Sequence, residues 1–368
     1  LHLFKKNTFV SMKKIYVILL VVLISCKKET VKLNFINEFT VKDSLMFDNT
    51  IIGGVSGIDY HNSDYYMVID DAGNPRVLVG NILIKNDSIK SVAFKKVIRL
   101  NDTSTQFYND NALDLESVFV NGDKINLVSE GSIRRGKNPT VFEIDINGTF
   151  QKEIETPNYF KANSIAKPKH NAAFESSSKS IGGKGFWVAM EAPLGTDGDE
   201  PTFHETESPV RITYFDDETD KATKQFAYQL EKIDKPAKGK VNLNGVTAIL
   251  QYSERDFFVI ERIYQSGYGS YGNVVRIFKA SIEEKSTNTL NIQSLKEKEY
   301  VPLKKELLFD FSSIQEKLTD KIIDNIEGIT FGPKLSNGNQ SLILVSDDNF
   351  QAYGKQLNQF ILLEIIDK

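Results

Sequence analysis

The chain has 368 residues, a formal net charge of −4 and a single cysteine. One cysteine excludes a disulfide within the chain and cysteine-based metal sites, and no basic stripe of the kind that binds nucleic acid is present. An acidic balance suits either cation binding or plain solubility, and the charge does not separate these two.

The N-terminal segment predicts export. Lys13 and Lys14 precede an unbroken apolar run at 15–24, which is followed by Ser25 and Cys26. This is the pattern of a secretory signal peptide, and the run is too short to span a bilayer, which needs roughly 20 apolar residues. Residues 23–26, LISC, resemble the lipobox of bacterial lipoproteins, in which the cysteine is acylated and becomes the first mature residue. The alternative is an uncleaved anchor with an incidental cysteine.

We therefore expect upstream residues and a lipoprotein signal peptide at 1–25, lipidation of Cys26, a short tether at 26–30 and one domain at 31–368. The mature protein is expected at a membrane, in the periplasm or on the cell surface. A lipidated Cys26 leaves no free thiol for catalysis. Removal of residues 1–25, which hold four lysines and no acid, takes the net charge to −8.

The rest of the chain predicts an all-β fold. Short apolar runs bounded by Gly, Asn and Asp recur in units of three or four. The expected strands are 55–60, 65–71, 76–84 and 94–100; 114–120, 124–131, 140–146 and 150–156; 172–180, 185–192, 210–216 and 224–231; 244–251, 256–263, 274–282 and 304–311; and 325–332, 341–348 and 360–366.

The fifth unit lacks a fourth strand, and the run 31–41 lies before the first unit. If 31–41 pairs beside 360–366, the units close into a ring, which is a β-propeller. Five blades are visible, and a sixth could lie in 283–303 or 85–113. A β-sandwich with extra hairpins is the alternative, but it does not predict an acid at the end of each second strand. The segment 311–326 is expected to form a helix capped by Ser312 or Ser313.

Acidic residues recur at matching points of the repeat. Those of the first strands are Glu116, Glu175 and Glu327, with Ser56 and Gly245 in the equivalent positions, and those that end the second strands are Asp70, Asp71, Glu130, Glu191, Glu261, Asp347 and Asp348. Inner strands of a propeller line its central channel, so we expect these carboxylates to converge. Crowded carboxylates raise one another's pKa unless a counter-charge is present.

Two sources of counter-charge are open. Calcium takes six to eight oxygen ligands and accepts such a site. Alternatively, arginines pair with the acids; the candidates are Arg76, Arg134, Arg135, Arg211, Arg262 and Arg276. Each acid could instead lock one blade to the next. The histidines lack the spacing of a zinc site, and no Gly-x-Ser-x-Gly sequence supports a hydrolase triad.

Several segments resemble the phytase-like family, described as having esterase-like activity of phytase. They are DLESVFV with LVSEGSIRR, AMEAPLGTDG, GVTAIL with FVIERIY, and NIEGITFGPKL with SLILVSDDNF, and the resemblance runs from about 51 to 366. The third repeat keeps Glu175 without a following glycine, and Asn244-Gly245-Val246 has no glutamate. The resemblance implies a propeller and a calcium-dependent phosphoester or ester hydrolase.

Two functions remain open: this hydrolase, and a non-catalytic propeller with structural calcium that binds a ligand or a protein partner. For the hydrolase, the candidate catalytic residues are Glu116, Glu175 and Glu327, the metal ligands are Glu130, Glu191, Glu261, Asp347 and Asp348, and the substrate-binding residues are Arg134, Arg135 and Arg262. We expect a monomer that acts on a small phosphorylated or ester substrate and binds no nucleic acid.

Overall fold

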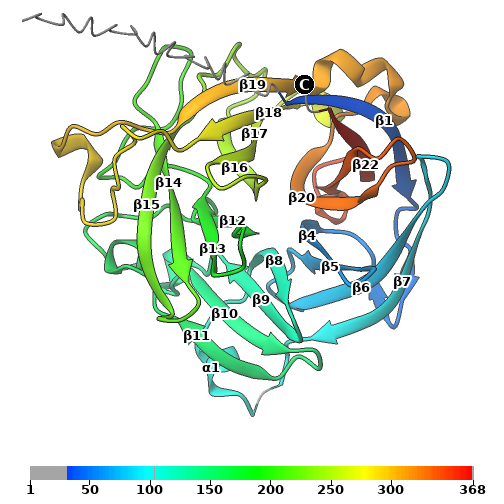
Figure 1. Cartoon of the computed structure of the whole chain (residues 1–368), viewed down its shortest axis with the longest axis horizontal. Helices are drawn as coiled ribbons and strands as arrows, with labels where there is room; N and C mark the ends of the chain where they lie inside the picture. Colours follow the sequence, from blue (N-terminus) through cyan, green and yellow to red (C-terminus); the bar gives the residue numbers. More distant parts are fainter. Residues whose placement is uncertain (1–30, 103, 367–368) are drawn as a thin grey trace, which may run out of the picture.

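The computed structural model describes residues 31–102 and 104–366. Five four-stranded antiparallel sheets are arranged in a ring around a central axis (Figure 1), so the chain is an all-β, five-bladed propeller, as predicted. The expected lipidation site, Cys26, lies outside the described residues. No helix within the described ranges is long and apolar enough to cross a bilayer.

Each of the first four blades is built from four consecutive strands that run from the axis outward. Their bounds are β4 (Val55–His61), β5 (Asp64–Ile69), β6 (Arg76–Ile84) and β7 (Ile89–Arg99); β8 (Leu115–Asn121), β9 (Lys124–Ser129), β10 (Thr140–Asp145) and β11 (Phe150–Ile154); β12 (Phe174–Lys179), β13 (Gly185–Met190), β14 (Pro209–Asp216) and β15 (Lys221–Gln229); and β16 (Asn242–Gln251), β17 (Asp256–Gln265), β18 (Asn273–Ser281) and β19 (Lys304–Asp310).

The fifth blade joins the two ends of the described chain. It contains β20 (Asn325–Lys334), β21 (Gln340–Asp347), β22 (Asn358–Ile366) and, at its outer edge, β1 (Lys32–Val41). Strands β1 and β22 pair antiparallel from Lys32 opposite Ile366 to Val41 opposite Asn358, and they lie side by side in Figure 1. The predicted closure of the ring by the N-terminal strand is therefore confirmed.

The remaining elements are short. They are the hairpin β2 (Met46–Phe47) and β3 (Thr50–Ile51), the helix α1 (Gln106–Asp110), and the 3₁₀ turns η1 (Ile133–Arg135), η2 (Asn158–Phe160), η3 (Gly269–Tyr271), η4 (Leu295–Glu297), η5 (Phe311–Lys317), η6 (Thr319–Lys321) and η7 (Asn349–Gln351). The described residues of the regions 85–113 and 283–303 therefore hold no sixth blade.

The helix expected at 311–326 is wrong in type and in cap. The segment forms two 3₁₀ turns that are separated at Leu318, and Asp320 within the second turn has a positive φ of 52°. The cap is Asp310, whose side chain accepts a hydrogen bond from the backbone N–H of Ser312 at 2.9 Å. Asp310 thus accepts from a backbone N–H group at the start of the turn that would otherwise lack a partner, as the side chain of a capping serine would.

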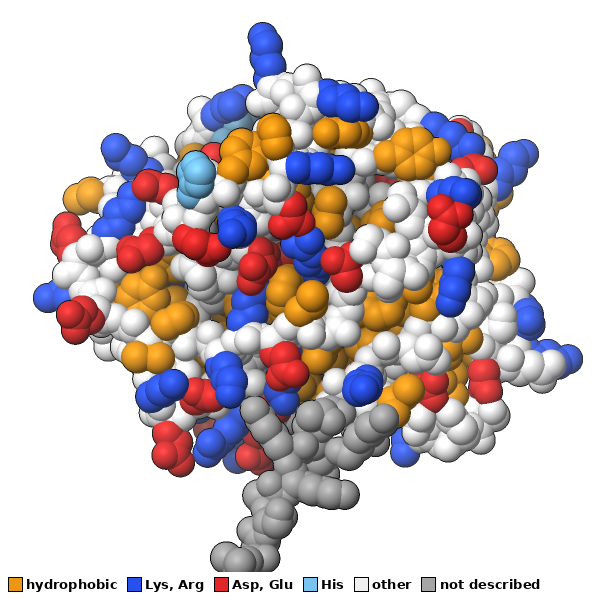
Figure 2. Space-filling view, turned by 90° about the horizontal axis from the view of Figure 1, so that it is seen from above, with side chains coloured by type: hydrophobic (Ala, Val, Ile, Leu, Met, Phe, Trp, Pro, Cys, Tyr) orange, Lys and Arg blue, Asp and Glu red, His pale blue; other side chains and the backbone are white. Residues whose placement is uncertain are grey.

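The core lies between the blades. The second strands β9 and β13 are buried on both faces except at the first residue of β9, because each is covered by a neighbouring blade on either side. This explains why these strands are continuous apolar runs, whereas the outermost strand β11 alternates between exposed and partly buried residues. On the face shown in Figure 2, acidic and basic side chains are interspersed.

Candidate metal and substrate site in the central channel

All five inner strands carry a β-bulge at the same point. The pairing of β4 skips from Val55 to Gly57, that of β20 skips from Ile326 to Gly328, and the other three inner strands shift in the same way. A bulge leaves one residue unpaired and re-aims its side chain. In blade order, the five bulged residues are Ser56, Glu116, Glu175, Thr247 and Glu327.

The two hydroxyl residues at the bulges join neighbouring blades. Ser56 Oγ donates a hydrogen bond to the carbonyl oxygen of Leu115, and Thr247 Oγ1 donates one to the carbonyl oxygen of Ile326, each at 2.8 Å. The three glutamates at the other bulges line a cavity on the axis instead. The same backbone feature therefore fixes blade contacts in two blades and delivers carboxylates to the channel in the other three.

A second ring lies at the end of the second strands. The backbone N–H groups of Glu130 and Glu191 donate to the carbonyl oxygens of Asp114 and Ala173. Both residues therefore directly follow the second-strand residue that pairs next to the bulge. The equivalent residues of the five blades, all of which line the cavity, are Asp70, Glu130, Glu191, Arg262 and Asp347. Four blades thus contribute an acid, and the fourth blade contributes the arginine.

The residues opposite this second ring form a third set of equivalent positions. They are Gly54, Asp114, Ala173, Gly245 and Asn325. Small residues at three of these positions leave room for the acids. At Gly245, a Cβ atom would lie 2.5 Å from Cγ of Glu191, so any larger residue would displace that carboxylate.

The cavity has a volume of about 650 Å³. The seven acids of the two rings and Arg262 line it, as do Leu243 of β16, Tyr264 of β17 and Val241, which directly precedes β16. The segments 267–273 and 349–356 complete the lining, and they are joined by a hydrogen bond from Ser270 Oγ to the carbonyl oxygen of Lys355. The charged residues of the rings thus share one cavity whose volume suits a small molecule.

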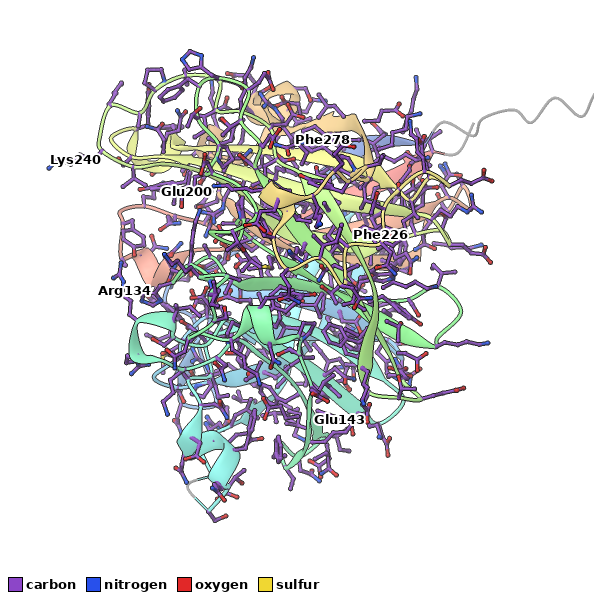
Figure 3. All side chains as sticks on the ribbon, turned by 90° about the vertical axis from the view of Figure 1, so that its left-hand side faces the viewer. Arg134, Glu143, Glu200, Phe226, Lys240 and Phe278 are labelled. Atoms are coloured by element: carbon purple, nitrogen blue, oxygen red, sulfur yellow. The ribbon has the colours of Figure 1, made fainter. Side chains whose placement is uncertain are left out.

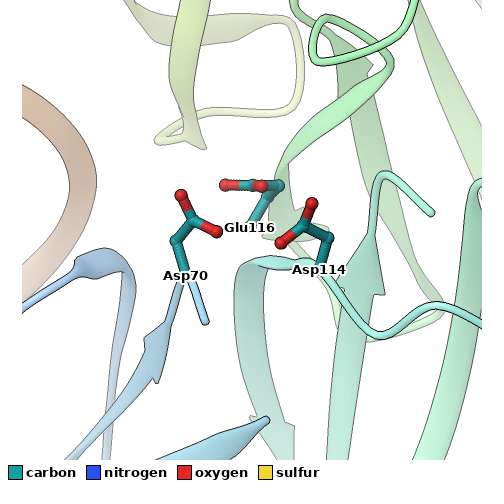
Figure 4. Close-up of side chains that lie close together, drawn as sticks. All are labelled: Asp70, Asp114 and Glu116. Carbon is teal, nitrogen blue, oxygen red and sulfur yellow. The ribbon is translucent and has the colours of Figure 1, made fainter. Parts of the chain in front are cut away.

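Two overlapping groups of carboxylates have the spacing of a metal site. One consists of Asp70, Asp114 and Glu116, whose side chains point toward one another in Figure 4, and the other of Glu116, Glu130 and Glu175. Within each group, one oxygen per residue lies within 4.8 Å of the others. Glu116 belongs to both groups, and all five residues come from the first three blades.

Burial raises the pKa of the ring acids. Burial, together with the neighbouring acids, raises the pKa of Asp70 to about 9 and that of Glu130 to about 8. The pKa values of Glu116, Glu175 and Asp347 are raised well above their ordinary range for the same two reasons. Without a cation, the cavity therefore retains protons near neutral pH, and its donor set of hard oxygens suits calcium.

Arg262 is the counter-charge on the opposite side. Its Nη2 lies 3.4 Å from Oε1 of Glu191 and 3.5 Å from Oε1 of Glu327. Its Nε–H is buried without a hydrogen-bond partner among the described residues. Burial raises the pKa of Glu327, and the nearby Arg262 offsets this in part, so that the pKa is about 8. One guanidinium cannot neutralise seven acids of the two rings.

The other candidate arginines do not supply this charge. Arg76 pairs with Asp71, and Arg276 pairs with Asp310 and Asp234. Arg211 pairs with Asp197 in a fully buried contact. Within the described part of the chain, the alternative of a ring neutralised by arginines therefore holds only for Arg262.

The positions of Arg134 and Arg135 do not agree with the prediction that they bind substrate. Both lie in the exposed turn η1, and neither lines the cavity. Arg135 Nε donates to Oγ of Ser132, and Figure 3 shows Arg134 toward the same face of the molecule as Lys240. The turn after β9 carries them away from the ring position that Glu130 occupies. Of the three predicted arginines, only Arg262 is in the site.

Glu261 does not join the other acids. It accepts hydrogen bonds from Tyr228 Oη at 2.7 Å and from Asn244 Nδ2 at 2.9 Å, and it pairs with Lys305. In the fourth blade the bulge lies at Thr247, not at Gly245, so the ring position falls on Arg262. Adjacent residues of a strand face opposite sides. The prediction placed Glu261 at the ring position, whereas the next residue, Arg262, occupies it.

Asp348 is also separate from the cavity. Its Oδ1 accepts from the backbone N–H of Gly54 at 2.8 Å, and its Oδ2 accepts from Asn358 Nδ2 at 2.9 Å. It fixes the turn η7 by accepting from the N–H of Phe350. The strand alternation that sends Asp347 into the cavity sends Asp348 away from it. The predicted clustering is therefore wrong for Asp348 and Glu261.

The clustering is confirmed for the remaining predicted acids. Those that line the cavity are Glu116, Glu130, Glu175, Glu191, Glu327 and Asp347. The residue that sequence reasoning missed is Asp114. Its signal is its position two residues before Glu116, because residues i and i+2 of a strand share a face. The equivalent pair in the fifth blade is Asn325 and Glu327.

The chain was compared with curated proteins, with solved structures and with protein families. No curated protein matches the chain. Among solved structures, an endo-arabinase from Bacteroides thetaiotaomicron is 13% identical with a TM-score of 0.44, covering 86% of this chain and 95% of that one. The catalytic domain of a Coprinopsis cinerea GH62 α-L-arabinofuranosidase is 10% identical with a TM-score of 0.43, covering 90% and 97%.

A putative glycoside hydrolase from Bacteroides ovatus is 10% identical with a TM-score of 0.42, covering 84% of this chain and 86% of its own. At these identities and TM-scores, the three structures carry no argument about activity.

The family comparison is stronger, because the profile of the phytase-like family matches residues 50–350, which include all five inner strands and both rings of channel residues. The chain belongs to the phytase-like family, described as having esterase-like activity of phytase.

Proposed function

We propose that this protein is a calcium-dependent hydrolase of small phosphate esters that acts outside the cytoplasm. The observation that carries the proposal is the composition of the two rings, in which seven acids and one arginine face one cavity. A purely structural cluster would be expected to balance its buried charges, because unpaired buried charge destabilises a fold. An excess of acids is instead the arrangement of a cation site.

The residues fit calcium. Asp70, Asp114 and Glu116 on one side and Glu130 and Glu175 on the other would hold it, since their oxygens lie within the spacing of a metal site. When bound, calcium supplies positive charge for phosphate oxygens and makes nearby water more acidic. Glu116 and Glu175, which the sequence offered as catalytic residues, are thereby assigned to metal binding.

Arg262 and Glu327 are proposed to act on the substrate. Arg262 has a buried Nε–H without a partner and holds its two carboxylates only at 3.4 and 3.5 Å, so its guanidinium is available for phosphate oxygens. Glu327 holds a proton at neutral pH, since its pKa is raised to about 8. We assign to it the protonation of the departing alcohol oxygen.

The test is turnover of phenyl phosphate by the purified domain, in calcium and in chelator. We expect turnover only with calcium, and its loss in Glu116→Gln. Glu143→Gln is the matched control, because Glu143 is a buried carboxylate of the same blade that pairs with Lys124 and does not line the cavity. Calcium binding without turnover of any phosphate ester would overturn the hydrolase and leave a ligand-binding propeller.

We further propose that the protein is held at a membrane by lipid on Cys26 and works as a monomer. Every ring residue comes from one chain, so no partner is needed to complete the site. Acyl chains contribute roughly 0.8 kcal/mol per buried methylene. Cys26→Ala should therefore move the protein from the membrane fraction to the soluble fraction, and a variant that stays membrane-bound would refute lipid anchoring.

A further inference from the structure

The two sides of the cavity differ in chemistry. All five residues of the two carboxylate groups with metal spacing belong to the first three blades. The side formed by the fourth and fifth blades has Arg262, the acids Asp324, Glu327 and Asp347, and four amide side chains, Asn273, Asn325, Asn349 and Gln356. We call the carboxylates of the first three blades the acidic wall, and the amides Asn273, Asn325 and Gln356 the amide wall.

All three amides of this amide wall have an oxygen without a hydrogen-bond donor. The unpartnered atoms are Asn273 Oδ1, Asn325 Oδ1 and Gln356 Oε1, each buried and each in a residue that lines the cavity. Asn325 is only 5% exposed. Buried polar atoms without a partner are rare in folded proteins and call for an explanation.

The orientation of two of these amides is set by neighbouring carboxylates. Asn325 Nδ2 donates to Oε1 of Glu327 at 2.8 Å, and Gln356 Nε2 donates to Oδ1 of Asp324 at 3.1 Å. Both amide nitrogens are therefore engaged as donors within the protein, and Oδ1 of Asn325 and Oε1 of Gln356 are the atoms left without a partner. The oxygens of Asn325 and Gln356 therefore remain acceptors.

An amide oxygen accepts a hydrogen bond and cannot donate one. A phosphate group, an unsubstituted aromatic ring or an ester whose hydroxyls are all phosphorylated offers no donor to this wall. A hydroxyl-bearing group does. The adjoining wall supplies the apolar side chains of Val241 and Leu243 and the ring of Tyr264, against which the carbon face of a sugar or another polyol can pack.

We propose that the amide wall is the subsite for the alcohol part of the substrate, and that this alcohol is a polyol with free hydroxyl groups. The inference rests on the proposed function and specifies its substrate class. The phosphate lies between the acidic wall and Arg262, and the hydroxyls donate to Asn273, Asn325 and Gln356.

The test compares three probes under calcium: glucose 6-phosphate, phosphoethanolamine and phenyl phosphate. Wild type should have the highest kcat/KM for glucose 6-phosphate. Asn273→Ala should lower the preference for glucose 6-phosphate over phenyl phosphate by roughly fivefold, which corresponds to one neutral hydrogen bond. Asn273 is the residue of choice because Asn325 and Gln356 also hold Glu327 and Asp324. The control is Asn81→Ala, since Asn81 is a half-buried asparagine of β6 outside the cavity.

Four results would overturn the subsite. They are equal kcat/KM for glucose 6-phosphate and phenyl phosphate, preference for phosphoethanolamine, an unchanged preference in Asn273→Ala, and a loss of calcium affinity in that variant, which would make the amide a metal ligand. If no probe is hydrolysed, the proposed function fails on its own. Calorimetric binding of glucose 6-phosphate and phenyl phosphate to wild type and Asn273→Ala then decides the subsite.

Discussion

Arg262 and Glu191 occupy the same position in neighbouring blades, and their side chains meet across the channel, with Nη2 of Arg262 at 3.4 Å from Oε1 of Glu191. The equivalent position carries an acid in four of the blades and a cation in the fourth blade along the chain. This one exchange makes the channel asymmetric, since it separates an acid-rich side that suits a metal from a side with a positive charge that suits an anion.

Replacement of this cation should separate metal binding from turnover. In Arg262→Met, calcium affinity should rise by about tenfold, because a repelling positive charge is removed from the cavity. Turnover of phenyl phosphate should fall by about 100-fold, because the phosphate oxygens lose their donor. Isothermal titration and initial rates measure the two effects.

The control for this experiment is Arg276→Met, which removes ion pairs with Asp310 and Asp234 at the edge of the blade. It should leave both quantities nearly unchanged. A parallel loss of calcium affinity and turnover in Arg262→Met would show that the arginine only holds the fold together, and its role in substrate binding would be abandoned.

Glu261 and Glu116 should respond in opposite ways to the same conservative change. Glu261→Gln breaks a buried pair with Lys305 and should lower the free energy of unfolding by roughly 3 kcal/mol, while the melting temperature still rises with calcium. Glu116→Gln replaces a carboxyl group whose neutral form is already favoured by burial and by neighbouring acids in the metal-free protein, so its melting temperature in chelator should not fall, and its response to calcium should be lost. Thermal unfolding with calcium and with chelator distinguishes the two.

The opposite assignment would follow if Glu261→Gln abolished the calcium response and Glu116→Gln preserved it. In that case the ring positions derived from the bulges would not be those that hold the metal. Both variants keep the size of the side chain, so a difference between them reports on charge and hydrogen bonding and not on packing.

The fold could be predicted from the sequence because blade interiors impose a simple pattern. Second strands such as β13 are buried on both faces and read as continuous apolar runs, and the unpaired run at 31–41 left one arrangement that closes the ring. The convergence of six acids on the channel followed from the repeat alone, since a propeller converts equal positions in the repeat into proximity.

The finer assignment within the site could not be predicted, because it depends on register. A bulge adds one residue to a strand and reverses the face of every residue beyond it. The sequence shows neither that the fourth blade bulges at Thr247 nor which member of the pair Asp347-Asp348 turns inward. The amide wall was missed for another reason: single asparagines and glutamines have no pattern until the fold brings them together.

Removal of the N-terminal strand should open the ring. Strand β1 pairs with β22 along its whole length, and deletion of residues 27–42 would leave the backbone groups of β22 unpaired at the sheet edge. Exposed edges promote association between chains, so size-exclusion chromatography should show aggregates. Deletion of residues 27–30 alone is the control and should give a monomer. A monomeric protein after the longer deletion would contradict the structural role of β1.

The pH dependence of stability should reverse when calcium is present. In the folded, metal-free protein the pKa of Asp70 is about 9 and those of Glu130 and Glu327 are about 8, whereas the same groups in the unfolded chain titrate near their ordinary values of 3.8 and 4.5. Between these limits the folded state binds more protons than the unfolded state. Its stability is therefore greatest at low pH and is lost as the pH rises toward 8 to 9.

In chelator, we accordingly expect the melting temperature to fall by more than about 5 °C between pH 6 and pH 9. Calcium requires ionised carboxylates and expels their protons, so with saturating calcium the melting temperature should hold steady or rise over the same range. Titration with calcium at pH 7 in buffers of different ionisation enthalpy should also show proton release. A metal-free protein whose stability rises from pH 6 to pH 9 would mean that the ring acids are already ionised, and calcium would then bind without displacing protons.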